Sequence, residues 1–324
     1  MTRSLKRTTS ADVARAAGVS RTTVSYVLNN RPGETIPEET RRRVMDAAER
    51  LHYRPHASAR ALAAGHTDIV LLSLPDLPVG PSLGRYVEEL AAALAEHGLT
   101  LLTHLMGTRS RALTDVCAAV GASAVLGFRS FDEETVQALH RVGAVVVLPT
   151  TRHSSTMTML GDAQAAHLIE RGHRSIGYLL PTEHPFTSMA EDRLSAVTEA
   201  CLQAGLAPPD SRVSALEIDP LARLAARWVE QGVTAVCAYN DEYAIALLAA
   251  MKQIGLTAPG DLAVVGVDDI PVARFAQPAL STVYVDLHEA GRQGAEAVVA
   301  GLRHQKTEEV LPVNVIRLVI RDSS

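Results

Sequence analysis

The chain has 324 residues, of which 47% are hydrophobic and 21% charged, and its net charge is −5. This composition supplies apolar side chains for two or three folded domains and excludes a disordered, collagen-like or disulfide-stapled protein. No apolar run approaches the ~20 residues that a membrane-spanning helix needs, and the first ten residues, MTRSLKRTTS, are too polar for a signal peptide. Widely spaced cysteines indicate buried, reduced thiols at Cys117, Cys201 and Cys237. We therefore expect a cytoplasmic protein with no membrane partner.

The charge is distributed unevenly along the chain. Residues 1–65 contain 12 Lys and Arg against 6 Asp and Glu, whereas residues 66–324 contain 19 against 30. A basic segment at one end of an acidic chain indicates contact with a polyanion. Apolar residues recur regularly between these charges, which distinguishes the segment from a solvated basic tail.

Residues 10–17 predict a first short helix. Ser10 is expected to cap it, and Gly18 follows at the point where a helix end favours a residue that tolerates positive φ. The apolar face of this helix would consist of Val13, Ala14 and Ala17.

A second helix is predicted from Ser20, its expected cap, to about residue 29. Apolar residues at helical spacing would form its buried side, at Val24, Val27 and Leu28. Two short helices joined by a tight, glycine-containing turn are typical of a helix-turn-helix, whose second helix enters the major groove of DNA. A third helix is predicted from about Pro37, with inward residues Val44, Ala47, Ala48 and Leu51.

The stretch DVARAAGVSRTTVSYVLN, followed by ETRRRVMDAAERLHYRPHASARALAAG, resembles the DNA-binding region of the LacI/GalR family of bacterial transcription regulators. The resemblance extends from about Thr9 to Gly65. It implies that base edges are contacted by Arg21, Thr22 and Tyr26. It also implies that phosphates are contacted by Ser20, Thr23, Ser25 and Asn29. Tyr26 stands where many members carry arginine, so the half-site is expected to differ from the commoner operator.

Residues 55–66 form a predicted linker between a helix-turn-helix head, residues 1–54, and a core, residues 67–324. About nine helix-compatible residues lie between Pro55 and Gly65, too few for a stable isolated helix. The resemblance implies a hinge helix that inserts Leu62 into the minor groove and bends the operator. Its minor-groove residues would be Ser58, Ala59, Leu62 and Ala63. The alternative is a plain alanine-rich linker.

From residue 69 onward, short β-rich runs alternate with 10–18 residues of helical pattern. The predicted strands are 69–75, 99–105, 124–128, 144–149, 175–180, 213–218, 234–239, 262–267 and 315–320. This alternation predicts an α/β fold: two lobes of doubly wound parallel sheet behind the all-α head. The chain contains no GxGxxG or GxxxxGK[ST] loop, no HExxH and no Gx[ST]xG elbow, so we expect neither an enzyme nor a cofactor or metal site.

The segments HLIERGHRSIGYL, AYNDEYAIALLAAMKQIGL and GDLAVVGVDDIPVARFAQPALSTV also resemble the LacI/GalR core, which is similar to periplasmic sugar-binding proteins. The resemblance implies a small effector between the lobes, contacted by Arg193, Asn240 and Asp268. The alternative is that Asn240 and Asp268 cap a helix or close a turn. The first lobe departs from the family, because VGPSLGRY (79–86) stands in place of an Asn-Pro-Phe-Phe-like segment and lacks its phenylalanines, and Met157-Thr158 replaces a polar pair. A typical sugar effector is therefore doubtful.

The resemblance implies a sequence-specific transcription regulator, and a repressor in particular, that binds a pseudo-palindromic double-stranded DNA operator in the bacterial nucleoid. Family members dimerise through the core. The last predicted strand is followed by no leucine heptads, so we expect a homodimer. Two alternatives stay open: a regulator of the same fold without small-molecule control, and, against the basic head, a small-molecule transport receptor.

Overall fold

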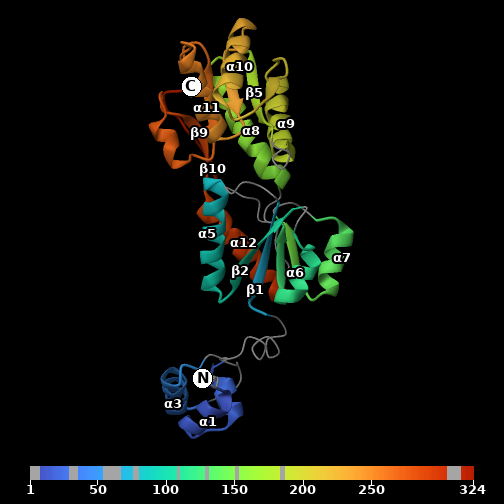
Figure 1. Cartoon of the computed structure of the whole chain (residues 1–324), viewed down its shortest axis with the longest axis vertical. Helices are drawn as coiled ribbons and strands as arrows, with labels where there is room; N and C mark the ends of the chain where they lie inside the picture. The colour runs from blue at the N-terminus through green and yellow to red at the C-terminus, as the bar shows by residue number, and fades with distance from the viewer. Residues whose placement is uncertain are drawn as a thin grey trace, which may run out of the picture. The chain divides into compact units, whose positions relative to one another are not determined.

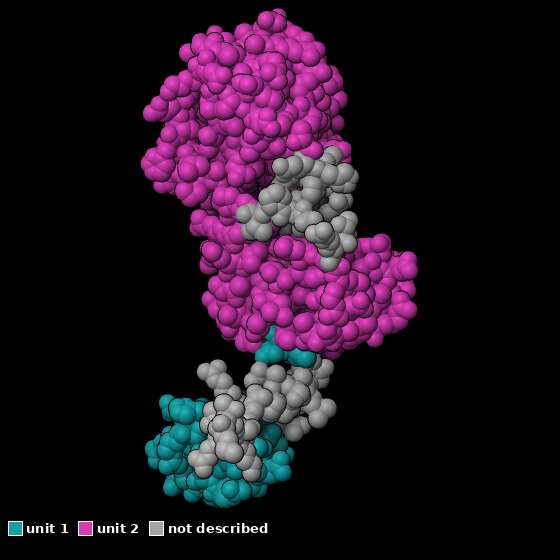
Figure 2. All heavy atoms as spheres, in the orientation of Figure 1, with its two compact units in different colours: residues 1–68 teal, residues 69–324 magenta. Residues whose placement is uncertain are grey.

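The structure is a computed structural model that describes residues 8–28, 36–53, 67–75, 80–107, 110–127, 131–149, 153–182, 187–304 and 315–324. The chain divides into two compact units, Met1–Asp68 and Ile69–Ser324, coloured separately in Figure 2. Each unit has its own hydrophobic core.

The first unit is a three-helix domain. Its helices are α1 (Ser10–Ala17), α2 (Arg21–Leu28) and α3 (Glu38–Arg50). Their facing sides form one apolar core, with the predicted inward residues Val13, Ala14, Ala17, Val24, Val27, Val44, Ala47 and Ala48 all buried. The amphipathic pattern therefore identified the packed side of each helix correctly.

The turn between α1 and α2 contains the predicted glycine and serine, but the residue that caps α1 differs from the prediction. Gly18 has φ 65° and ends α1 in the left-handed conformation. Ser20 caps α2, because its Oγ accepts a hydrogen bond from the Thr23 N–H at 3.0 Å. The prediction for Ser10 was wrong, since Ser10 is the first residue of α1 and Thr9 occupies the cap position. Asp12 makes Thr9 the better cap, because its carboxylate accepts from the Thr9 N–H at 3.0 Å and from the Thr9 hydroxyl at 2.6 Å.

The second unit has two lobes, each built around its own sheet (Figure 1). The first lobe contains a parallel sheet of order β2-β1-β3-β4. Helices α5 and α12 lie side by side on one face of this sheet, and α6 and α7 cover the other (Figure 1). The element bounds are β1 (Ile69–Pro75), α5 (Pro81–Glu96), β2 (Thr100–Met106), α6 (Leu113–Val120), β3 (Ala124–Gly127), α7 (Glu133–Arg141), β4 (Val146–Pro149) and α12 (Leu287–Leu302).

The second lobe contains a sheet of order β10-β9-β8-β7-β5-β6. Helices α8 and α9 pack on one face and α10 and α11 on the other. The element bounds are α8 (His153–Glu170), β5 (Ile176–Pro181), α9 (Thr187–Gln203), β6 (Asp210–Ser214), α10 (Ile218–Glu230), β7 (Ala235–Ala238), α11 (Asp241–Gln253), β8 (Ala263–Val267), η2 (Pro271–Phe275), β9 (Ser281–Val285) and β10 (Ile316–Val319). The chain passes from one lobe to the other after β4, after β9 and again after α12.

Two strands of the second lobe differ from the predictions. The run predicted at 213–218 forms a strand only at 210–214, and Ile218 already begins α10. The predictions omitted β9, which pairs parallel with β8 and antiparallel with β10. The second sheet is therefore parallel except at this last pair.

Two further expectations concern the cysteines and the membrane. Cys117, Cys201 and Cys237 are free and buried, as predicted. Within the described ranges, none of the helices combines the length and apolar character needed to cross a membrane.

Candidate nucleic-acid interface and interlobe site

The outer side of α2 presents polar side chains to solvent. Arg21 and Thr22 are exposed in its first turn, Ser25 is exposed one turn later, and Tyr26 is half-buried. The opposite side of α2 is anchored by Val24 and Val27, which are 1% and 3% exposed. The core therefore anchors the apolar side of α2 and leaves its polar side facing outward.

Arginines on all three helices contribute positive charge to the first unit. Arg15 on α1 lies 3.4 Å from the Asp12 carboxylate, and Arg41 on α3 lies 4.0 Å from that of Glu38. Arg21 is exposed at the amino-terminal end of α2, where the helix dipole adds positive potential. A phosphate or base-edge acceptor would meet both the dipole and the guanidinium there.

Two of the remaining predicted DNA-contacting residues take part in a helix cap, and the others lie outside the described residues. Ser20 and Thr23 are occupied with the helix cap, since their hydroxyl oxygens lie 2.9 Å apart. The phosphate contact predicted at Asn29 and the hinge residues lie outside the described residues: Ser58, Ala59, Leu62 and Ala63.

The predicted effector contacts come from three elements of the second lobe. Arg193 is on α9, Asn240 directly precedes α11, and Asp268 follows β8. Strands β7 and β8 are parallel neighbours, so the residues after them lie at the same edge of the sheet. Arg193 reaches this edge from α9, because its Nη1 donates to the Tyr239 carbonyl oxygen and its Cζ lies 4.8 Å from the centre of the Tyr239 ring.

The first lobe contributes to the same edge through the start of α5. The Ser82 hydroxyl interacts with the Asp268 carboxyl, and Gly80 lies close to the Glu242 side chain. We call the group formed by Ser82, Arg193, Tyr239, Asn240, Glu242 and Asp268 the interlobe site. The predictions omitted Ser82, Tyr239 and Glu242, although Ser82 lies in the segment 79–86 that departs from the family.

The electrostatics of the interlobe site centre on Asp268. Loss of hydration raises the pKa of its carboxyl to about 6, although Arg193 and Ser82 act in the opposite direction. Glu242 raises this pKa further by repulsion between like charges. Asp268 has φ 108°, a conformation that non-glycine residues rarely adopt. An acidic group with a raised pKa, held beside a buried arginine, is typical of a binding site.

Asn240 acts as a helix cap in this structure. Its Oδ1 accepts from the Tyr243 N–H at 3.1 Å, and its Nδ2 lies 3.4 Å from Glu242 Oε2. The alternative expected for Asn240, a helix cap, is thus confirmed.

Comparisons with known proteins support both units. Residues 9–56 match the model of "Bacterial regulatory proteins, lacI family", and residues 165–324 match that of a "Periplasmic binding protein-like domain". The chain is 31% identical to the transcriptional regulator GalR of Escherichia coli, over 96% of this chain and 94% of GalR. It is 28% identical to the transcriptional repressor PurR of Edwardsiella ictaluri, over 96% of each.

Solved structures show the same fold along nearly the whole chain. A Lac repressor dimer bound to operator and an anti-inducer superimposes with a TM-score of 0.76 at 21% identity, covering 98% of this chain and 99% of the repressor. A complex of the transcriptional regulator CelR with cellobiose gives a TM-score of 0.66 at 26% identity, covering 98% of this chain and all of CelR.

Proposed function

The chain belongs to the lacI family of bacterial regulatory proteins, and we propose that it is a cytoplasmic repressor that binds a pseudo-palindromic operator as a homodimer. It is a DNA-binding transcription regulator, as its GalR and PurR relatives are. A two-fold symmetric dimer matches the symmetry of such an operator and places one α2 on each half-site. The observation that carries the proposal is a rigidly anchored α2 with a solvent-facing polar side.

In this proposal α2 is the recognition helix. Arg21 would read a guanine through O6 and N7, Thr22 and Tyr26 would contact neighbouring bases, and Ser25 would contact a phosphate. Tyr26 has one hydroxyl and an aromatic ring in place of a forked guanidinium. It therefore favours a different base from the one that an arginine would select at that position.

The proposed hinge adds a second contact in the minor groove. Leu62 would act as an apolar wedge that separates one base step at the operator centre. We expect Leu62→Ala to reduce both operator affinity and the bend angle, measured by anisotropy and by gel mobility of circularly permuted DNA. An unchanged bend angle would show that Leu62 is not the wedge.

A small molecule in the interlobe site would regulate operator binding. Arg193 and Asp268 offer it a donor and an acceptor, and Tyr239 offers an aromatic surface. Such a ligand changes operator affinity only by the difference between its affinities for the two arrangements of the lobes. A molecule that satisfies both Arg193 and Asp268 would stabilise the arrangement in which α5 stays close to them.

A second candidate function is a regulator of the same fold without small-molecule control. One observation favours it: Arg193, Asn240 and Asp268 already interact with groups of this chain, at Tyr239, Tyr243 and Ser82 respectively. A ligand would have to replace these internal contacts.

Fluorescence anisotropy with a family-type palindrome and a scrambled duplex tests both candidates. We expect tight binding to the palindrome that weakens steeply with salt, because α2 and the basic head contact phosphates. A metabolite that shifts this affinity establishes the effector proposal, whereas a panel without effect favours the second candidate. Equal affinity for both duplexes would overturn sequence-specific recognition.

A further inference from the structure

Two consecutive residues after β8 adopt backbone conformations that L-amino acids avoid. Asp268 has φ 108° and Asp269 has φ 48°. Such conformations are energetically unfavourable and persist only where the surroundings hold them. This turn is the element that directs the Asp268 carboxyl towards Arg193, so its restraints matter for the interlobe site.

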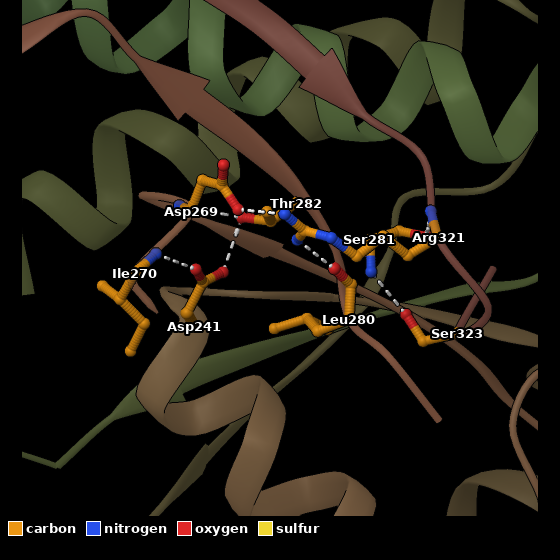
Figure 3. A network of polar contacts seen from close by, with 8 residues as sticks. All are labelled: Asp241, Asp269, Ile270, Leu280, Ser281, Thr282, Arg321 and Ser323. Carbon is orange, nitrogen blue, oxygen red and sulfur yellow. Dashed lines mark hydrogen bonds and ion pairs between the residues drawn. The ribbon is translucent and has the colours of Figure 1, made fainter. Parts of the chain in front are cut away.

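The backbone of the turn is bonded to β9 and to α11. The Asp268 N–H donates to a carbonyl of β9 at 2.8 Å, and the Asp269 N–H donates to Thr282 Oγ1 at 3.3 Å. The Ile270 N–H donates to Asp241 Oδ2 at 2.9 Å, and Thr282 donates to Asp241 Oδ1 at 2.6 Å (Figure 3). These bonds restrain the backbone but leave the Asp269 side chain to be held by other means.

Arg321 holds the Asp269 side chain. Its Nη2 lies 2.5 Å from Asp269 Oδ1, and its Nη1 donates to the Leu280 carbonyl oxygen at 2.7 Å (Figure 3). The two side chains of the ion pair are only 17% and 12% exposed, so water and salt screen them little. Because one planar guanidinium binds both the turn and Leu280, the residue directly before β9, it resists rotation of Asp269.

The backbone around Arg321 is fixed in turn to the second sheet. The Arg321 N–H donates to Ser281 Oγ at 2.9 Å, and Ser323 Oγ accepts from the Ser281 N–H at 2.8 Å. Ser323 Oγ also donates to the Val264 carbonyl oxygen at 2.7 Å. The guanidinium thus projects from a segment that cannot shift without breaking bonds to β8 and β9.

We infer that Arg321 is a positioning residue for effector recognition: by holding Asp269, it keeps the turn in its positive-φ conformation and the Asp268 carboxylate directed to Arg193. The inference rests on the proposed function, in which a small molecule contacts Asp268. It assigns this role to a residue that lies 53 positions along the chain from Asp268 and acts on it through another side chain.

The direction in which the pKa of Asp268 changes when Arg321 is removed distinguishes a positioning role of Arg321 from a purely electrostatic one. The ionisable groups that interact with Asp268 include Arg193, Tyr239, Asp241 and Glu242. If Arg321 acted only as a positive charge, its removal would raise the pKa of Asp268 further. If Arg321 holds the turn, its removal lets Asp268 reach water, and the pKa falls from about 6 towards the ordinary value of about 4.

The test is a titration of the full chain carrying aspartate labelled with ¹³C at the carboxyl, with Asp268→Asn assigning the resonance. We expect Arg321→Gln to lower the pKa of Asp268 by one to two pH units and Arg321→Lys to lower it by about half as much. Arg317→Gln is the matched control, because Arg317 is on β10 and lies over the Tyr284 ring, 4.4 Å from its centre. It removes the same charge and should leave the pKa of Asp268 unchanged.

A pKa of Asp268 that stays constant or rises in Arg321→Gln overturns the inference. If Arg321→Gln does not fold, the pKa of Asp268 in Arg321→Lys tests the inference by the same criterion. Failure of the proposed function gives a different result: no metabolite shifts operator binding of the natural chain, while the titration still determines what Arg321 does.

Discussion

Helix α2 takes its proposed DNA-contacting side chains from eight consecutive residues, whereas the interlobe site combines residues 82, 193, 240 and 268 from four separate segments. In the helix, the polar side chains face solvent and the apolar ones fill a small core. In the interlobe site, polar groups contact one another and depend on the packing of two lobes. A single substitution on α2 should therefore affect only the contact that it removes. The interlobe site should also respond to substitutions at residues far from it.

The largest expected effect comes from a glycine that lies outside the interlobe site. A Cβ added to Gly161 on α8 would overlap the Arg193 carbonyl oxygen and lie 3.0 Å from the Ala196 Cβ. We expect Gly161→Ala to lower the free energy of unfolding of the second unit by about 3 kcal/mol, because α8 and α9 must separate. Chemical denaturation measures this loss, and the transition of the first unit should stay unchanged as an internal control. A stable variant would show that α9 can move without cost.

The next effect is a pH dependence that arises at Asp241. Burial raises the pKa of its carboxyl to about 8 in the folded chain, against about 4 in the unfolded one. The folded state therefore binds more protons at this group between these values, so the stabilisation that Asp241 contributes is greatest below pH 4 and is lost as the pH rises to 8. We expect this contribution to the free energy of unfolding to fall steadily across the window.

Asp241→Asn removes the titrating group and keeps its shape. The difference in unfolding free energy between the natural chain and this variant, measured in urea at pH 5, 6.5 and 8, should change steadily in favour of the variant. Parallel pH curves for the two proteins would contradict the assignment to Asp241.

At helix α2, the proposed base reader Arg21 leads us to expect a loss of discrimination confined to one base pair. Arg21→Ala should reduce discrimination at one position of each half-site by about 2 kcal/mol, because a forked donor to guanine is lost. Anisotropy with single-base operator variants measures it. Arg15→Ala is the matched control, since Arg15 carries the same charge on α1, and it should weaken all sequences equally and slightly. A uniform loss for Arg21→Ala would mean that Arg21 contacts only phosphate.

The smallest expected effect is the loss of a helix cap. Ser20→Ala removes the acceptor of the Thr23 N–H and should destabilise the first unit by about 1 kcal/mol. Thermal unfolding followed by circular dichroism checks this, with Thr22→Ala as a control at an exposed position of the same helix. Equal melting temperatures for Ser20→Ala and the natural chain would show that the cap contributes nothing.

Most of the first unit could be predicted from sequence because its determinants are local. Gly18, Ser20 and the apolar spacing of α2 act within a few residues of one another. The error at Ser10 was also local, since the pairing of Thr9 with Asp12 competes for the same helix end.

The two errors in the second sheet have non-local causes. Strand β9 contains Ser281 and Thr282, which are fully buried although polar, because their hydroxyls bond Arg321 and Asp241 about forty residues away. Strand β6 lies at the edge of its sheet, so Val213 remains 61% exposed and the apolar run that suggested a longer strand is not buried there.

The helix-turn-helix, the alternation of strands and helices, and the membership of the regulator family could all be derived from the amino-acid sequence, because helix caps, periodicity and motif spacing are properties of neighbouring residues. The folded chain was needed to show that Ser82 meets Asp268, that Arg193 reaches Tyr239, and that Arg321 binds the turn beside them. Each of these contacts joins residues 40 or more positions apart, and the lowered hydration that shifts the pKa of Asp268 exists only after both lobes have packed.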